Sequence, residues 1–120
     1  MALTIYERNG GFPAIRRMIA DFYEEALDSP VIGHHFEDID MPRLMDHQTR
    51  FVSFLMGGPS ASYSDEHIAR VHAKRGITHD EFDEMVALLS EAMTDHDFPK
   101  DDIAAVRAEL SRRESLIVTA

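Results

Sequence analysis

Four polar side chains stand where the hydrophobic pattern of the chain predicts buried positions. Tyr23 lies among the apolar residues of one expected helix, and His72 lies at the inner edge of another. His47 and Gln48 lie on or beside the apolar face of a third. A buried polar group without a partner costs about 1 to 3 kcal/mol. Either these groups bond to one another and to the backbone, or they surround a polar pocket.

The histidines show no spacing typical of a zinc site. His67 and His72 are five residues apart and point away from each other around a helix, unlike the i, i+4 pair of metalloproteases. His34 and His35 are adjacent, and we expect their side chains to diverge as well. On spacing alone, a single histidine placed like His72 is more often a packed, hydrogen-bonded side chain than a ligand.

Composition excludes several classes of partner. The chain has 120 residues, 22 of them acidic and 12 basic, which gives a net charge of −10 and predicts one domain over 1–120 that repels nucleic acid and anionic lipid. It has no cysteine, so disulfides and thiolate chemistry are excluded. No leader-like segment or membrane-spanning apolar run is present. We therefore expect an unexported, cytoplasmic protein without membrane insertion.

The spacing of apolar residues predicts helices throughout and no strands. A first helix runs from residue 12 to near the sequence Asp-Ser-Pro at 28–30, and a short turn follows over 31–36. Asp40 is the expected N-cap of a second helix, with Pro42 in its first turn and its end at 57–59. An all-α fold follows, with a bundle as one of the arrangements that fit.

The second half of the chain contains a short helix and two longer ones. Residues 60–76 hold about two helical turns, and 57–76 is longer than a minimal bundle needs, which is typical of functional segments. Thr78 and Glu81 have the spacing of a capping box for the next helix. The segment 95–102 ends it, and a last helix begins near Pro99, with Leu116 and Ile117 facing inward.

Ordered motifs give the chain a resemblance to a known family. They are IYERNGG at 5–11, DFYEEAL at 21–27, Phe36 before DIDMPRL at 38–44, HQTRF at 47–51, GGP at 57–59, and VHAKRGIT at 71–78 followed by Phe82. In order and spacing the chain resembles the group I truncated haemoglobins over nearly its whole length. The resemblance implies a two-over-two helical sandwich, which is a shortened globin fold, with haem b between its helices.

The resemblance assigns roles to several residues. His72 matches the proximal ligand of the haem iron, and Phe36 matches a haem-packing phenylalanine. Tyr23 and Gln48 match the distal residues that donate hydrogen bonds to the ligand of the iron. Leu44 takes a distal position where many relatives carry glutamine.

Further residues are expected at the edge of the haem. Arg43 and Arg75 match basic residues near the haem propionates, although exposed surface charge explains them equally well. Phe51 and Phe82 belong to the matching motifs and are expected to contact the haem.

His47 stands at a position that varies in the family. Some relatives have lysine there, reaching a propionate, whereas cyanobacterial members have histidine that binds the iron as a sixth ligand. The His-Gln pair with phenylalanine three residues later resembles the second set. We hypothesise that His47 and His72 bind the iron together in the resting state. A propionate contact and a solvated helix edge remain as alternatives.

The family resemblance also predicts function. No histidine follows His96, so the covalent haem attachment of some relatives is not expected. The implied activity is binding of dioxygen and nitric oxide, and nitric oxide dioxygenation would need an electron-donating reductase as partner. A haem-based redox or ligand sensor and a haemless helical interaction module with an acidic binding surface are the alternatives.

Overall fold

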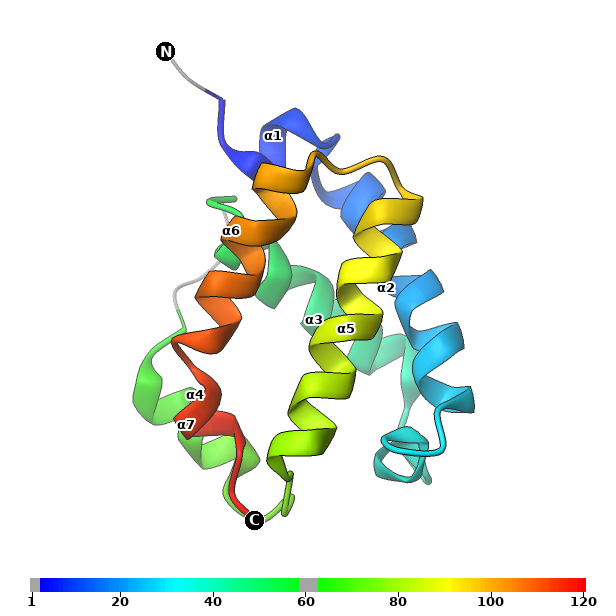
Figure 1. Cartoon of the computed structure of the whole chain (residues 1–120), viewed down its shortest axis with the longest axis vertical. Helices are drawn as coiled ribbons and strands as arrows, with labels where there is room; N and C mark the ends of the chain where they lie inside the picture. Colours follow the sequence, from blue (N-terminus) through cyan, green and yellow to red (C-terminus); the bar gives the residue numbers. More distant parts are fainter. Residues whose placement is uncertain (1–2, 59–62) are drawn as a thin grey trace.

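The protein is all-helical in the part of the chain that the structure describes. The computed structural model describes residues 3–58 and 63–120, and no strand occurs within them (Figure 1). Pro59, assigned above to a helix end, and residues 60–62, at the start of the segment 60–76, lie outside this part. None of the described helices is long and apolar enough to cross a lipid bilayer. The elements are α1 (Ile5–Arg8), α2 (Gly11–Asp28), the 3-10 helix η1 (Gly33–Phe36), α3 (Met41–Leu55), α4 (Asp65–His72), α5 (His79–Asp95), α6 (Lys100–Ser111) and α7 (Glu114–Ile117).

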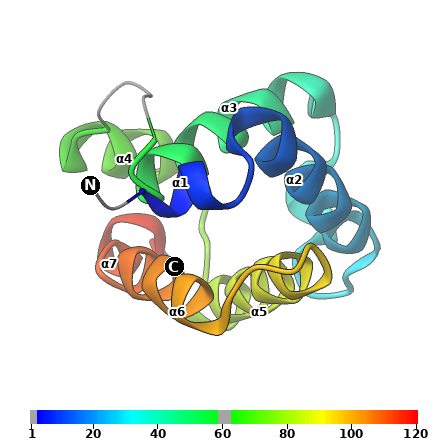
Figure 2. The same ribbon diagram turned by 90° about the horizontal axis from the view of Figure 1, so that it is seen from above.

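The helices form two layers. Seen from above, α1 to α4 lie in one layer and α5 to α7 in the other (Figure 2). Helix α2 packs on α3 within its own layer and on α5 across the interface, while α5 packs on α6 and α4 contacts α7. The pairs α2/α3 and α5/α6 therefore make the two-over-two sandwich, and the predicted fold is confirmed.

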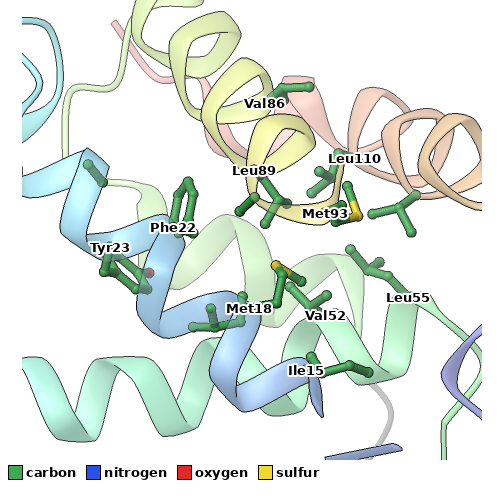
Figure 3. Close-up of a cluster of buried hydrophobic side chains, with 14 of the residues drawn as sticks. Ile15, Met18, Phe22, Tyr23, Val52, Leu55, Val86, Leu89, Met93 and Leu110 are labelled. Atoms are coloured by element: carbon green, nitrogen blue, oxygen red, sulfur yellow. The ribbon is translucent and has the colours of Figure 1, made fainter. Parts of the chain in front are cut away.

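The hydrophobic core lies between the layers. Apolar side chains from α2, α3, α5 and α6 converge there and are at most 8% exposed (Figure 3). They are Ile15, Met18 and Phe22 of α2, Val52 and Leu55 of α3, Val86, Leu89 and Met93 of α5, and Leu110 of α6. Their three- and four-residue spacing in the sequence is the cause of this convergence.

Short-range capping fixes the starts of the main helices. The Asp40 side chain accepts a hydrogen bond from the backbone N–H of Arg43 at 3.2 Å, as expected for the N-cap of α3. At the start of α5, Thr78 Oγ1 accepts from the N–H of Glu81 at 3.1 Å, and Glu81 Oε1 accepts from the N–H of Thr78 at 2.9 Å. Both predicted caps are confirmed.

The two ends of the chain differ from the expectation. Helix α1 was not predicted, although Thr4 and Glu7 form a capping box that could have indicated it. The last helix ends at Ser111, and Leu116 and Ile117 belong to the separate helix α7. The break has a local cause, because the guanidinium of Arg113 donates to the carbonyl of Glu109 at 2.7 Å while its N–H turns to Leu110.

Truncation of a buried apolar side chain should destabilise the protein much more than truncation of an exposed one. Met93 is completely buried and points between the layers, so Met93→Ala should lower the free energy of unfolding by about 2 to 5 kcal/mol. Leu27 is 47% exposed, and Leu27→Ala should change it by no more than about 0.5 kcal/mol. Urea denaturation of the three proteins measures both values. Equal losses in the two variants would contradict the core assignment.

Candidate functional site

A cavity of about 450 Å³ lies between the two layers. Its volume falls in the range of about 300 to 1,000 Å³ typical of ligand pockets. Its wall is mostly apolar and aromatic, with a few polar side chains among them. Nine of the residues proposed above for the site line this wall: Tyr23, Phe36, Leu44, His47, Gln48, Phe51, His72, Arg75 and Phe82. Arg43 is exposed and is not part of the wall.

His72 is positioned by the helix that carries it. Helix α4 is capped by Ser64, whose hydroxyl accepts from the N–H of His67 at 3.1 Å, and it is anchored by the buried Ile68. One turn before His72, the carbonyl of Ile68 lies 2.7 Å from His72 Nδ1. This carbonyl can only accept, so Nδ1 carries a proton, and in the neutral ring Nε2 keeps its lone pair.

The surroundings of His72 favour its neutral form. Burial lowers the pKa of His72, the hydrogen bond to Ile68 opposes this, and the nearby charges of Arg75 and His67 lower the pKa further. A neutral imidazole whose second nitrogen is hydrogen-bonded is the form that binds a metal ion. The arrangement therefore suits a metal ligand better than a structural ion pair.

The end of the chain holds the loop that follows His72. Thr119 Oγ1 accepts from the N–H of Gly76 at 3.1 Å and donates to the carbonyl of His72 at 3.4 Å. The N–H of Thr119 donates to the carbonyl of Ile77 at 2.9 Å. These contacts fix the exit from α4.

Tyr23 brings a hydroxyl into the cavity wall. The residue is 5% exposed, and its ring packs edge to face on Phe22 and Phe36, with centroids 4.8 and 5.4 Å away. Its hydroxyl has no hydrogen-bond partner among the described residues. Burial raises the pKa of Tyr23 far above its usual value, so the group remains a protonated donor.

Helix α3 contributes two further polar groups. Gln48 is half-buried and His47 is exposed, and both side chains line the cavity. Within 3–58 and 63–120, neither side chain forms a hydrogen bond to protein. The simpler interpretation, in which Tyr23, His47 and Gln48 bond to one another or to the backbone, is therefore wrong for the described part of the chain. These groups remain available to a ligand.

Sequence reasoning missed part of the wall. Tyr63 lines the cavity and packs edge to face on Phe51, with centroids 5.2 Å apart. The unusual length of 57–76 was the signal that this segment has a function. His35 and Glu81 also line the cavity.

The prediction that His34 and His35 diverge was wrong. Successive residues of a 3-10 helix are about 120° apart, which favours divergence near the backbone. However, η1 faces the start of α5, and both rings reach the same carboxylate of Glu81. Nε2 lies 3.1 Å from Glu81 Oε2 in His34 and 2.7 Å in His35.

Removal of the Tyr23 hydroxyl should not cost stability. Since this group has no partner in the described protein, Tyr23→Phe should leave the free energy of unfolding unchanged or raise it. Tyr6→Phe is the control, because the Tyr6 hydroxyl accepts from the N–H of Phe12 at 3.0 Å and its loss should cost about 0.5 to 1.5 kcal/mol. Urea denaturation measures the free energy of unfolding of both variants and of the unmodified protein. A loss of more than about 1 kcal/mol in Tyr23→Phe would mean that the hydroxyl is structural.

Comparison with known proteins agrees with this geometry. Residues 4–118 match the bacterial-like globin family. The group 1 truncated haemoglobin GlbN of Synechocystis sp. is 30% identical over 109 residues, which cover 88% of this chain and 87% of GlbN. The Fe(III) form of Tetrahymena pyriformis truncated haemoglobin superposes with a TM-score of 0.88 at 22% identity, over 97% of this chain and 98% of that one. The Synechococcus sp. 2/2 haemoglobin, in the cyanomet state with covalently attached haem, gives 0.86 at 21% identity, over 98% and 100%. The chain therefore belongs to the bacterial-like globin family, and its relatives there include group 1 truncated haemoglobins.

Proposed function

We propose that the cavity holds haem b without a covalent link and that the loaded protein binds dioxygen and nitric oxide. The observation that carries the proposal is His72, whose Nδ1 is bound to the Ile68 carbonyl and whose Nε2 keeps its lone pair at the cavity wall. Membership of a globin family makes haem the expected cofactor.

The residues of the cavity fit this cofactor. His72 would hold the iron through Nε2. Phe36 and Phe82 provide flat apolar wall for the porphyrin, and exposed Arg75 at the wall offers a positive charge to a propionate in a chain of net charge −10. Arg43 lies outside the wall, so the proposal rests on Arg75 for this contact.

The positions of His79 and His96 support non-covalent binding of the haem. His79 and His96 are not part of the cavity wall. His79 Nδ1 lies 2.6 Å from Glu114 Oε2, and His96 Nε2 lies 2.7 Å from Asp21 Oδ2. With these rings engaged at the surface, the haem should be extractable by acid acetone.

Tyr23 and Gln48 would act on the bound ligand. Haem iron would supply the position at which diatomic ligands bind. It would also supply the one electron that conversion of dioxygen and nitric oxide to nitrate requires. The Tyr23 hydroxyl stays protonated because of its burial, and the Gln48 amide has no other acceptor in the described protein. Both can donate to a ligand that carries partial negative charge. Repeated turnover would need an external reductase as partner.

Haem binding tests the proposal directly. Untagged protein titrated with haemin should give a Soret band with one equivalent per chain, and His72→Ala should weaken haem binding at least about tenfold, or about 1.4 kcal/mol. His67→Ala is the matched control, because His67 lines the same cavity from the same helix. It should leave the Soret band unchanged. A band insensitive to His72→Ala would reject the haem site and favour a haemless interaction module.

We further propose that His47 binds the iron as sixth ligand in the resting state. It lines the same cavity as His72, and its ring has no partner among the described residues. In that case external ligands must compete with an internal one, and apparent ligand affinity falls with the fraction of open protein.

The spectrum of His47→Ala tests this second proposal. The unmodified protein, when reduced, should be low-spin with resolved α and β bands. His47→Ala should be high-spin and should bind carbon monoxide at least about tenfold faster, since no internal ligand has to leave. His67→Ala should behave like the unmodified protein. Unchanged spectra and rates in His47→Ala would show that His47 contacts a propionate or solvent instead.

A further inference from the structure

Three side chains that can bind a metal ion meet beside the cavity. One ring nitrogen each of His34 and His35 and a carboxylate oxygen of Glu81 lie within 4.8 Å of one another. The two imidazole rings lie next to each other, with centroids 4.2 Å apart and planes tilted by 36°. Of the three, only His35 and Glu81 belong to the cavity wall, and His72 is not part of the cluster.

The backbone under the two histidines is firmly held. The N–H of Gly33 donates to the carbonyl of Ser29 at 2.9 Å, and a Cβ at Gly33 would stand only 2.7 Å from the carbonyl oxygen of Leu27. Ser29 Oγ donates to Glu84 Oε2 at 2.8 Å, which ties the approach to η1 directly to α5. The cluster is therefore built between two elements whose relative position is already fixed.

Glu81 is oriented by the helix that it caps. Its Oε1 accepts from the N–H of Thr78, and its Oε2 faces the two histidines. The hydrogen bond from the Thr78 backbone is the main cause that lowers the pKa of Glu81, with burial opposing it and His35 adding to it. The carboxylate is thus charged at neutral pH. An outer hydrogen bond of this kind is what orients ligating carboxylates in metal sites.

We propose that His34, His35 and Glu81 form a binding site for one divalent transition-metal ion of the Co²⁺ to Zn²⁺ series. Two imidazole nitrogens and one carboxylate oxygen make a donor set that suits these ions. One cation would satisfy both ring nitrogens and the carboxylate together, whereas two imidazolium rings at 4.2 Å would repel each other.

The distances are close to those that such an ion requires. Bonds of about 2.0 to 2.2 Å in tetrahedral geometry place ligand atoms roughly 3.4 Å apart. The observed separations of 3.1 and 2.7 Å from Glu81 Oε2 need to open by about 0.3 and 0.7 Å. The His34 side chain is 58% exposed, so it can move and leaves an entry path and a fourth position for water.

Occupation of the site would also reach the cavity. The ion would bind η1 to the start of α5, and η1 ends at Phe36, whose ring packs on Tyr23. The proposed metal would therefore stiffen the part of the wall that carries the Tyr23 hydroxyl.

Zinc binding to untagged, haem-loaded protein tests the proposal. Dialysis against micromolar Zn²⁺ followed by metal analysis should give one zinc per chain above the haem iron, and calorimetric titration should give the affinity. His34→Ala and Glu81→Gln should each weaken zinc binding at least about tenfold. Glutamine can still serve at this position of a capping box, so Glu81→Gln removes the ligand and keeps the cap.

His79→Ala is the matched control. His79 and Glu114 form an exposed histidine–carboxylate pair without a second histidine, so this variant should bind zinc like the unmodified protein. Zinc should raise the Tm of the unmodified protein and of His79→Ala, but not of the other two variants. Absence of zinc binding, or equal binding in all four proteins, would overturn the proposal. Haem is read separately from its Soret band, so failure of either site is distinguishable from failure of the other.

Discussion

The packing of α2 against both α3 and α5 is the contact on which the rest of the structure depends. Its inward side chains Ile15, Met18 and Ile19 are at most 1% exposed, so α2 joins the two layers through a closely packed core. Away from this core the layers do not close on each other, and the cavity remains between them. A rigid core and an open cavity are thus two results of one helix arrangement, and the cavity can exist because the core supplies the stability.

The polar groups of Tyr23, Gln48 and His72 in the cavity do not form hydrogen bonds with one another in the described protein and are free to bind a ligand. Tyr23 and Gln48 present donors without acceptors in the described protein, whereas His72 has one nitrogen bound and the other available. An arrangement that satisfied all three groups internally would be more stable in the empty protein. The observed structure lacks these internal hydrogen bonds and the stability that they would add. This is the physical reason to regard the cavity as a binding site.

The sequence was sufficient for features that depend on neighbouring residues. Hydrophobic spacing located the long helices, and Asp40 and Thr78 were identified as caps because their partners lie within one turn. The sequence was insufficient where residues distant in the chain meet, or where a side chain competes with the helix for a backbone carbonyl. The side chains of His35 and Glu81 are 46 positions apart in the chain, and no local pattern brings them together. The break before α7 arises because the Arg113 side chain takes a carbonyl that a continuing helix would use. The resemblance assigned Arg43 and Arg75 the same role, but only the structure distinguishes their positions.

The contacts of Thr119 determine when the site can be complete. This residue holds the loop after His72 from 47 positions further along the chain. Because the chain is synthesised in order, α4 and its histidine are made before residue 119, so the exit from α4 lacks this support while α5, α6 and α7 are still being made. His72 is thus part of the chain before the residue that completes its surroundings has been added. Assembly of the cavity is tied in this way to completion of the fold.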